Sequence, residues 1–245
     1  MRQIYAKQVI MEENKEYCYK YPHAAITADN VVFGFDGKGL YVLLIKRGEG
    51  TYEDVGALPG GFMHIDETIE QCALRELQEE TNAKDVYLEQ FHVFSTVDRD
   101  PRERVVTVGF LALVRKGDYI NVRGGDDAKE AKWFNYEQLP PLAFDHQEII
   151  AKAHSVLRDR MRSNGLAFCL LDQKFGVDEL RSLCEAVFDT KYDRRNFYKK
   201  FTSAPYILED EGEQPMACSR AAHYSFSKDA FDEARSVPPK YPFDF

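Results

Sequence analysis

The chain has 245 residues, 44% of them hydrophobic, which is typical of a globular protein and allows one large or two smaller domains. The formal net charge of −9 argues against bulk electrostatic coating of nucleic acid, although it leaves room for a local basic patch. Five scattered cysteines without a CxxC pair disfavour a disulfide framework or zinc knuckle, and no apolar run is long enough for a membrane span. We therefore expect a cytoplasmic protein without a membrane partner.

Strand-like runs dominate the chain from about residue 23 to residue 113. Residues 24–35 and 40–47 flank DGKG, a sequence that predicts a β-hairpin, and residues 86–97 and 104–114 flank the polar loop DRDPRE. One clear helix is predicted within residues 66–81, with Asp66 as its N-cap, and another over residues 147–161. Strands mixed with a few helices predict an α+β or layered α/β domain that ends near Met161.

The pattern changes beyond RSNG at residues 162–165, which has the composition of a linker. A helix that buries one face is predicted by the spacing of Leu180, Leu183, Cys184, Val187 and Phe188. A further helix, RRNFYKKF, is expected after Asp193 as its cap, followed by two short strand-like runs and a last short helix. This order of helices and a hairpin is typical of a winged-helix module.

The segment GGFMHIDETIEQCALRELQEET, residues 60–81, carries six carboxylates and a single arginine. On a helix, Glu76, Glu79 and Glu80 fall within an arc of roughly 100°. Like charges at this spacing repel one another, so the pattern predicts a positive partner. Oxygen-rich sites of this kind suit Mg²⁺ or Mn²⁺. The alternative is a solvated acidic helix face, which is what most glutamate-rich helices form.

This segment resembles the signature of the Nudix hydrolase family, in which a glycine, a glutamate and an Arg-Glu…Glu-Glu helix follow at fixed spacing. The chain supplies, in register, Gly61, Glu67, Arg75, Glu76, Leu77, Glu79 and Glu80. It departs at the final glycine, where Asn82 stands. Because asparagine is the next-best residue for a left-handed helix end, we expect the loop geometry to survive.

The resemblance implies a catalytic set made of Glu67, Arg75, Glu76, Glu79 and Glu80. The last three would be the ligands of Mg²⁺ or Mn²⁺, while the Glu67–Arg75 pair would hold loop and helix together. It also implies a Nudix α/β/α sandwich with a mixed sheet over residues 1–162, acting on a nucleoside diphosphate linked to another group. A domain that binds such a ligand without cutting it is the other interpretation.

Several residues outside the helix are expected to bind the substrate. The loop DRDPRER, residues 98–104, resembles the RDPRGR loop of Nudix proteins that handle ADP-ribose, and Asp145–His146 matches the same group. The expected substrate-binding residues are Arg47, Gly60, Gly61, Arg99, Arg102, Arg104 and His146. A solvated loop for the arginines and a structural or capping role for His146 stay open. Gly56 stands where relatives usually carry tryptophan.

Residues 165–245 resemble the C-terminal winged helix of Nudix-related transcriptional regulators. The candidate DNA contacts are Arg194, Arg195, Lys199 and Lys200. However, this region carries 11 Lys/Arg against 14 Asp/Glu. The expected wing contains Glu209, Asp210, Glu211 and Glu213, with Arg220 nearly alone against them.

Because phosphates repel an acidic wing, the sequence favours an enzyme whose winged helix supports a homodimer. The preferred reaction is cleavage of ADP-ribose, or a related nucleoside diphosphate sugar, to AMP and a sugar phosphate. The alternative is a transcriptional regulator whose Nudix domain binds an ADP-ribose-like or sugar effector and whose winged helix binds DNA.

Overall fold

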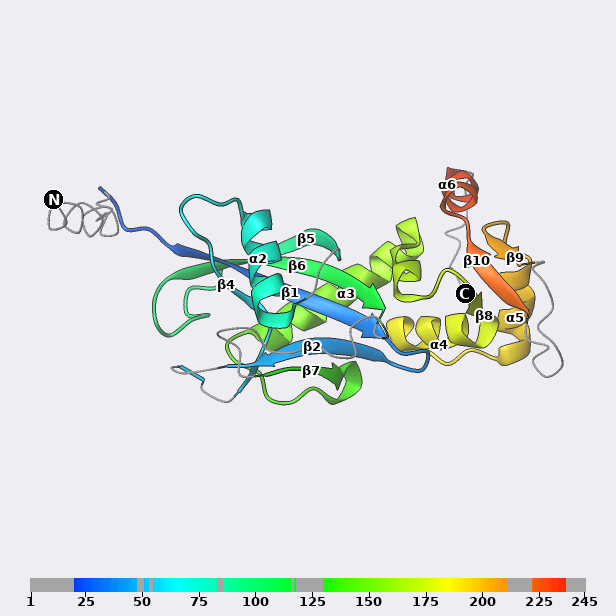
Figure 1. The fold of residues 1–245 in the computed structure, drawn as a ribbon, viewed down its shortest axis with the longest axis horizontal. Helices are drawn as coiled ribbons and strands as arrows, with labels where there is room; N and C mark the ends of the chain where they lie inside the picture. Colours follow the sequence, from blue (N-terminus) through cyan, green and yellow to red (C-terminus); the bar gives the residue numbers. More distant parts are fainter. Residues whose placement is uncertain are drawn as a thin grey trace, which may run out of the picture.

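The computed structural model describes residues 20–47, 51–52, 55–82, 86–115, 117, 130–210 and 222–236. The molecule is elongated, with a body of sheet and helices toward the N-terminus and a smaller body, mostly helical, toward the C-terminus (Figure 1). Within the described residues, none of the helices is long and apolar enough to cross a membrane.

The N-terminal body is built on a seven-stranded mixed sheet. Its strands are β1 (Ala25–Phe35), β2 (Leu40–Lys46), β3 (Gly56–Ala57), β4 (Gly60–Phe62), β5 (Tyr87–Phe94), β6 (Val105–Arg115) and β7 (Glu130–Asn135). The central strand β1 is parallel to β6 and antiparallel to β2 and β4. The remaining pairs, β2–β3, β2–β7 and β5–β6, are antiparallel. The predicted mixed sheet and the hairpin around DGKG are thus confirmed.

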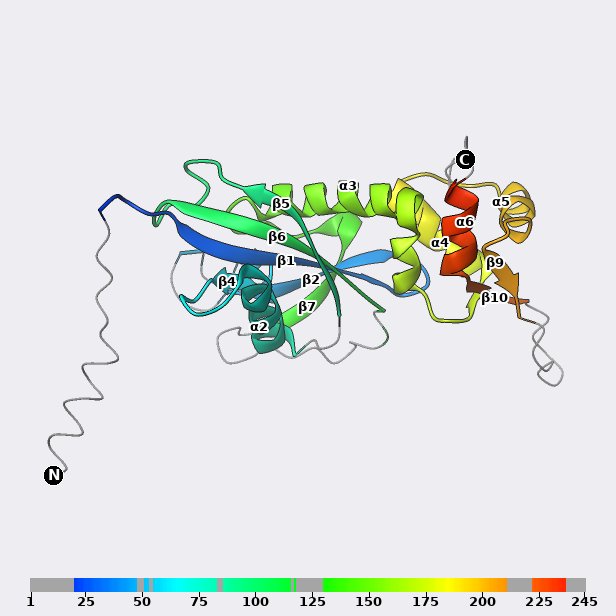
Figure 2. The same ribbon diagram turned by 90° about the horizontal axis from the view of Figure 1, so that it is seen from above.

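Helices cover both faces of this sheet (Figure 2). Val32 of β1 packs with Leu77 of α2 (Ile69–Thr81) on one face. Its neighbours Val31 and Phe33 pack on the other face, in the core that includes α3 (His146–Asn164). Since alternate side chains of a strand point to opposite faces, β1 serves two cores at once. The predicted α/β/α sandwich is confirmed.

The start of α2 differs from the prediction. Thr68, and not Asp66, is the N-cap: its hydroxyl accepts the Gln71 N–H while the Gln71 side chain accepts the Thr68 N–H. This reciprocal capping box fixes the start of the helix beyond Asp66 and satisfies two backbone donors. At the other end, Asn82 adopts the predicted left-handed conformation, with φ of 57°.

RSNG is not a linker, because α3 continues through Asn164 and ends at Gly165, whose φ is 67°. The division into residues 1–162 and 165–245 stays a prediction. The C-terminal body contains a short 3-10 helix, η3 (Leu166–Leu170), and the elements β8 (Phe175–Gly176), α4 (Val177–Phe188), α5 (Arg194–Thr202), β9 (Ile207–Glu209), β10 (His223–Phe226) and α6 (Lys228–Ser236). Asp193 caps α5 as predicted. The wing between β9 and β10, with Glu211, Glu213 and Arg220, lies mostly outside the described residues.

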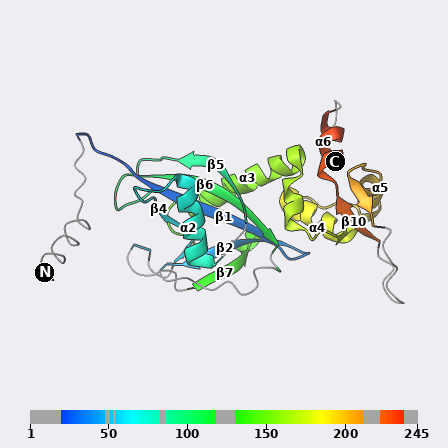
Figure 3. The ribbon, with the colours of Figure 1, turned by 45° about the horizontal axis from the view of Figure 1, so that its top comes forward.

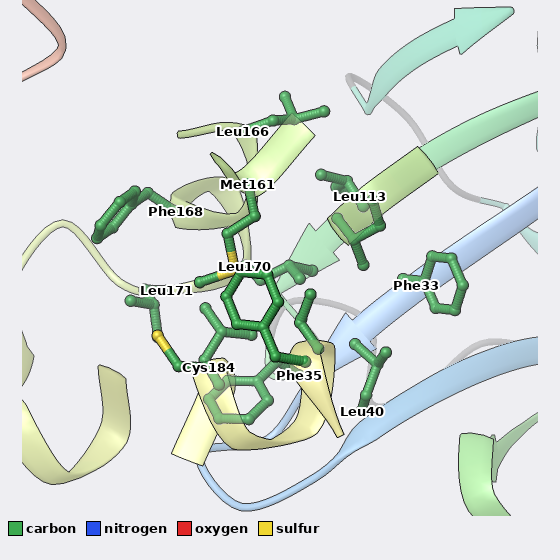
Figure 4. Close-up of a cluster of buried hydrophobic side chains, with 14 of the residues drawn as sticks. Phe33, Phe35, Leu40, Leu113, Met161, Leu166, Phe168, Leu170, Leu171 and Cys184 are labelled. Carbon is green, nitrogen blue, oxygen red and sulfur yellow. The ribbon is translucent and has the colours of Figure 1, made fainter. Parts of the chain in front are cut away.

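One continuous hydrophobic core joins the two bodies. Figure 3 shows α3 leading from the sheet toward the C-terminal helices. At the junction, Phe35 and Leu40 of the β1–β2 hairpin meet Met161 of α3, Leu170 of η3 and Cys184 of α4 (Figure 4). All five side chains are nearly or fully buried. The two bodies therefore pack as one unit, because separating them exposes a large apolar surface to water.

Candidate active site

A pocket of about 490 Å³ opens where β1 changes partners. Over residues 27–29 β1 pairs with β4, and over residues 33–35 it pairs with β2. Its lining comes from the acidic face of α2, from the loop DRDPRER at residues 98–104 (the arginine loop), and from the residues around the start of α3. The lining residues are Thr27, Asp29, Arg47, Leu58, Gly60, Gly61, Phe62, His64, Arg75, Glu76, Glu79, Glu80, Arg99, Asp100, Arg102, Val105, Phe144 and His146.

Arg75 is the positive partner of the acidic helix face. Its Nε and Nη2 donate to Glu67 at 2.9 and 2.7 Å, which confirms the predicted pair. Its Nη1 donates to Glu76 at 2.7 Å and to Glu79 at 3.1 Å, two contacts that the sequence did not predict. The hydrogen bonds from Arg75 lower the pKa of Glu67 to about 2. A single guanidinium thus relieves much of the repulsion along α2.

The two glycines before α2 lie where neighbouring atoms come very close to the backbone. A Cβ atom on Gly61 would lie 2.3 Å from Oε1 of Glu76, and one on Gly60 would lie 2.2 Å from the Ala28 carbonyl oxygen. At Gly60 the clash is with the backbone, so only glycine lets β4 lie this close to β1, whereas a side chain at Gly61 would displace the Glu76 carboxylate. The same packing half-buries Glu76 and raises the pKa of its carboxyl group.

Glu80 is the most buried carboxylate on the acidic face, with 9% of the residue exposed. Its Oε2 accepts the Gly60 N–H at 2.8 Å. Burial raises the pKa of Glu80 to about 8, and the nearby negative charges of Glu76 and Asp29 act in the same direction. A cation that binds beside this carboxyl group would favour its ionised form.

The donor set of α2 suits a hard divalent cation, since three carboxylates from one helix face line the same pocket. As the side chains stand, no three acidic, histidine or cysteine groups of the described residues converge on one point. The reason is visible in the contacts, because Arg75 holds both Glu76 and Glu79. A cation that binds here would take these two carboxylates from Arg75, which would keep Glu67.

The floor of the pocket is a buried charge network. Arg99 donates from Nε and Nη2 to the two oxygens of Asp145, at 2.9 and 2.6 Å, and from Nη2 to Asp29 at 3.4 Å. His146 accepts the Leu58 N–H on Nδ1 at 2.9 Å, and its Nε2 lies 3.7 Å from Asp29. Burial lowers the pKa of His146, so the ring is neutral near pH 7.

Gly60 and Gly61 line the pocket, and the other predicted substrate-binding residues, four arginines and His146, divide into three groups. Arg99 and His146 line the pocket and also bind protein groups, Arg99 through Nε and Nη2 and His146 through Nδ1. Arg47 and Arg102 line the pocket beside Phe144, with their guanidinium carbons 5.0 and 5.3 Å from its ring centroid. Arg104 lies elsewhere: its guanidinium donates to backbone carbonyl oxygens at residues 95, 96 and 105.

Asp29, Phe62 and Phe144 line the pocket and were not predicted from the sequence. A signal did exist for Asp29, since it interrupts an otherwise buried strand that reads ITADNVVFGF, and a charge there needs a partner. Phe144 directly precedes the Asp145–His146 pair, but no sequence pattern marked it as a pocket residue. Its position depends on the turn before α3, which only the fold reveals.

A second candidate surface lies on α5. The helix buries Phe197 and Phe201, and its four candidate DNA contacts, Arg194, Arg195, Lys199 and Lys200, are exposed on it. Arg194 also forms an ion pair with Asp178 of α4 at 2.6 Å. The helix therefore presents a basic face, as predicted, while Glu209 at the end of β9 is exposed nearby along the chain.

Comparisons with known proteins cover both bodies. Residues 23–153 match the model of the NUDIX domain, and residues 167–226 match that of the NrtR DNA-binding winged helix domain. An ADP-ribose pyrophosphatase of Methanocaldococcus jannaschii is 38% identical over 146 residues, which are 60% of this chain and 82% of the relative. An ADPR responsive transcriptional repressor, NtrR, of Acinetobacter baylyi is 29% identical over 86% of each chain.

A solved structure shows the same two-part arrangement. The crystal structure of Shewanella oneidensis NrtR complexed with a 27mer DNA matches with a TM-score of 0.67 and 27% identity. The match covers 84% of this chain and 94% of that one. With the NUDIX model matching more than half of its residues, the chain belongs to the Nudix family and carries a winged helix of the NrtR type behind its Nudix domain.

Proposed function

We propose that this protein is a metal-dependent Nudix pyrophosphohydrolase that cleaves ADP-ribose, or a related nucleoside diphosphate sugar, to AMP and a sugar phosphate. One observation carries the proposal. Glu76, Glu79 and Glu80 of α2 line a single pocket together with two arginines, Arg47 and Arg102. Such a pocket offers carboxylates for a cation on one side and guanidinium groups for phosphates on the other. The similarity to an ADP-ribose pyrophosphatase supports the same substrate class.

Nudix hydrolases generally use divalent metal ions, and we propose Mg²⁺ or Mn²⁺ here, held by Glu76, Glu79 and Glu80. When bound, such an ion supplies positive charge that offsets the diphosphate and polarises its P–O bonds. Water adds to one phosphorus while the bridging P–O bond breaks, so the two phosphates leave on separate products.

The chain's own residues prepare the pocket for this reaction. Arg75 anchors the loop before α2 through Glu67 and keeps the acidic face ordered before a cation arrives. The Gly60 N–H fixes one oxygen of Glu80, so this carboxylate is already oriented. The Arg99–Asp145 pair holds the arginine loop against the start of α3. These contacts reduce the reorganisation that binding would otherwise require.

Incubation of the purified protein with ADP-ribose and Mg²⁺ tests the proposal. We expect AMP and ribose phosphate in equal amounts, and a loss of turnover of at least about a hundredfold in Glu79→Gln. Glu70→Gln is the matched control, because Glu70 is exposed on the same helix but does not line the pocket. If AMP does not form, or if Glu79→Gln is as fast as the parent, the assignment is wrong.

A second candidate function is a ligand-responsive repressor. It is favoured by the match of residues 167–226 to a DNA-binding winged helix and by the exposed basic face of α5. Duplex selection from a random-sequence library at physiological salt, with and without ADP-ribose, tests it. The regulator predicts an enriched sequence whose binding changes with ADP-ribose and disappears in Arg194→Glu/Arg195→Glu. Without such enrichment, only the hydrolase stands.

Two further assignments belong to the same proposal. We place the protein in the cytoplasm, where its scattered cysteines stay reduced. We also propose a homodimer, in which the winged helix contributes to the contact between protomers. Analytical ultracentrifugation of the full chain tests the dimer, which predicts a mass twice that of the 28.3 kDa chain.

A further inference from the structure

Two residues near the pocket have a backbone conformation that side chains normally avoid. Among the described non-glycine residues, φ is positive at Tyr52, Asn82, Phe144 and Asp189. Asn82 and Asp189 are helix C-caps, where this conformation is common. Tyr52 and Phe144 have no such role, and their rings meet edge to face with centroids 4.9 Å apart. Strain of this kind persists only where the surroundings impose it, and it is concentrated at functional sites.

The chain on both sides of Phe144 is held firmly. The Ala143 N–H donates to the Gly56 carbonyl oxygen at 2.9 Å. The two residues that follow are the buried pair of the pocket floor: Asp145 binds Arg99, and His146 accepts the Leu58 N–H. These contacts, on both sides of Phe144, fix its φ angle. Glycine would adopt this conformation without strain, so the presence of a large ring indicates that the ring has a use.

The ring of Phe144 serves as a platform for two cations. The guanidinium carbons of Arg47 and Arg102 lie 5.0 and 5.3 Å from its centroid, within the range of cation–π attraction. Arg102 is tethered by Asp100 at 2.7 Å, and Arg47 by the Thr51 carbonyl oxygen at 3.1 Å. Both arginines line the pocket that the carboxylates of α2 also line.

The positive charges of Arg47 and Arg102 repel each other, and nearby carboxylates, Asp100 among them, oppose this repulsion. Burial, and then the charge of Arg102, lower the pKa of Arg47. A ligand with two linked negative charges relieves this repulsion better than a single phosphate does, because each guanidinium can bind its own phosphate. The attraction of each arginine to the ring offsets part of the repulsion in the empty pocket.

We propose that Phe144 is a positioning residue that holds Arg47 and Arg102 as a two-armed clamp for the substrate's diphosphate. The inference deepens the proposed function, on which it rests, by assigning the clamp to one side of the pocket and the cation to the other. The competing role, a platform on which a nucleobase stacks, is less favoured. Both arginines already lie within cation–π distance of this half-buried ring.

Calorimetric titration of the full-length protein with inorganic pyrophosphate, at fixed Mg²⁺ concentration, tests the clamp without requiring turnover. We expect Phe144→Leu to weaken binding roughly five- to tenfold, the effect of losing two cation–π contacts. Phe144→Tyr retains an aromatic face and should restore binding. In the Arg47→Gln/Arg102→Gln background, Phe144→Leu should have no further effect. Affinity for adenosine should not change.

Arg47→Lys provides a second route that leaves the strained position intact, so it serves even if Phe144→Leu folds poorly. Lysine keeps the charge but loses the planar contact with the ring. Its matched control is Arg162→Lys, which removes a guanidinium contact of 4.9 Å with Phe188, far from the pocket. We expect weaker pyrophosphate binding in the first variant and unchanged binding in the control.

Three results would overturn the clamp. The first is pyrophosphate affinity that stays at the parent value in both Phe144→Leu and Arg47→Lys. The second is loss of adenosine affinity with pyrophosphate affinity intact, which would make Phe144 a base platform. The third is an effect of Phe144→Leu that persists without both arginines. Because these are binding measurements, none depends on whether ADP-ribose is hydrolysed.

Discussion

At the scale of single residues, Arg75 explains how an acidic helix face stays folded. Its guanidinium binds Glu67, Glu76 and Glu79 at once, in the region where a divalent cation is proposed to bind. The sequence contained every one of these residues, yet it predicted only the pair with Glu67. Helical spacing does not show that one side chain can reach back to the loop and forward along the helix at the same time.

Gly61→Ala tests the close approach beneath Glu76. The added methyl group would lie 2.3 Å from Oε1, so it must push this carboxylate away from its place in the pocket. We expect kcat/KM for ADP-ribose to fall by about a hundredfold while the fold survives, because misplacing a catalytic group by about 1 Å has effects of this size. Gly176→Ala is the control, since a Cβ atom there meets nothing within 4 Å. Equal activity in both variants would contradict this role of Gly61.

At the scale of elements, α2 was predictable and its exact start was not. The carboxylate pattern located the helix and Asn82 located its end, because both signals are local. Asp66 was wrong as the N-cap because the Thr68–Gln71 capping box competes with it and satisfies more backbone donors. Likewise, RSNG has the composition of a linker, but α3 continues through its first three residues. Met161, just before RSNG, packs in the core between the two bodies and stabilises this part of the helix.

Removal of the capping box should therefore destabilise the protein. Thr68→Ala deletes the acceptor of the Gln71 N–H, and we expect the free energy of unfolding to fall by about 1 kcal/mol in urea titration. Asp66→Ala is the matched variant from the same loop and should change it by less than about 0.5 kcal/mol. The opposite order of effects would mean that Asp66 caps the helix in solution.

The candidate site shows the same division between local and long-range information. The segment that resembles the Nudix signature is short and continuous, so its residues could be located from the sequence, and the resemblance supplied the roles expected of them. Asp29, Arg99 and Phe144 come from three distant segments, and their meeting depends on β1, β6 and the turn before α3. Substrate binding by Arg99 stays a prediction, and the structure adds a buried network that the sequence did not indicate, in which Arg99 pairs with Asp29 and Asp145.

At the scale of the whole molecule, the shared core makes the winged helix an integral part of the structure. His154 lies in this junction: it belongs to α3 and stacks on Tyr136 with ring centroids 4.3 Å apart. Burial lowers the pKa of His154 from 6.5 to about 4, and the positive charge of Arg158 contributes. The ring is therefore neutral in the folded protein at neutral pH.

Stability should depend on pH through this histidine. Between pH 6.5 and pH 4, His154 is protonated in the unfolded chain but stays neutral in the folded protein. The free energy of unfolding therefore decreases as the pH falls through this range. We expect His154 to account for about 1–2 kcal/mol of the stability lost between pH 7 and pH 5. In urea titrations, His154→Phe should lose correspondingly less over that interval. Equal losses in the two proteins would show that His154 titrates normally.

Binding of a divalent cation to the acidic face of α2 tests the central claim most directly. Mn²⁺ titration followed by electron paramagnetic resonance, with and without ADP-ribose, measures it. The account predicts binding that ADP-ribose strengthens, that Glu76→Gln weakens at least about tenfold, and that Glu70→Gln leaves unchanged. If Mn²⁺ does not bind even with ADP-ribose present, or if both variants behave alike, then Arg75 is the only cation this surface holds and the proposed chemistry is wrong.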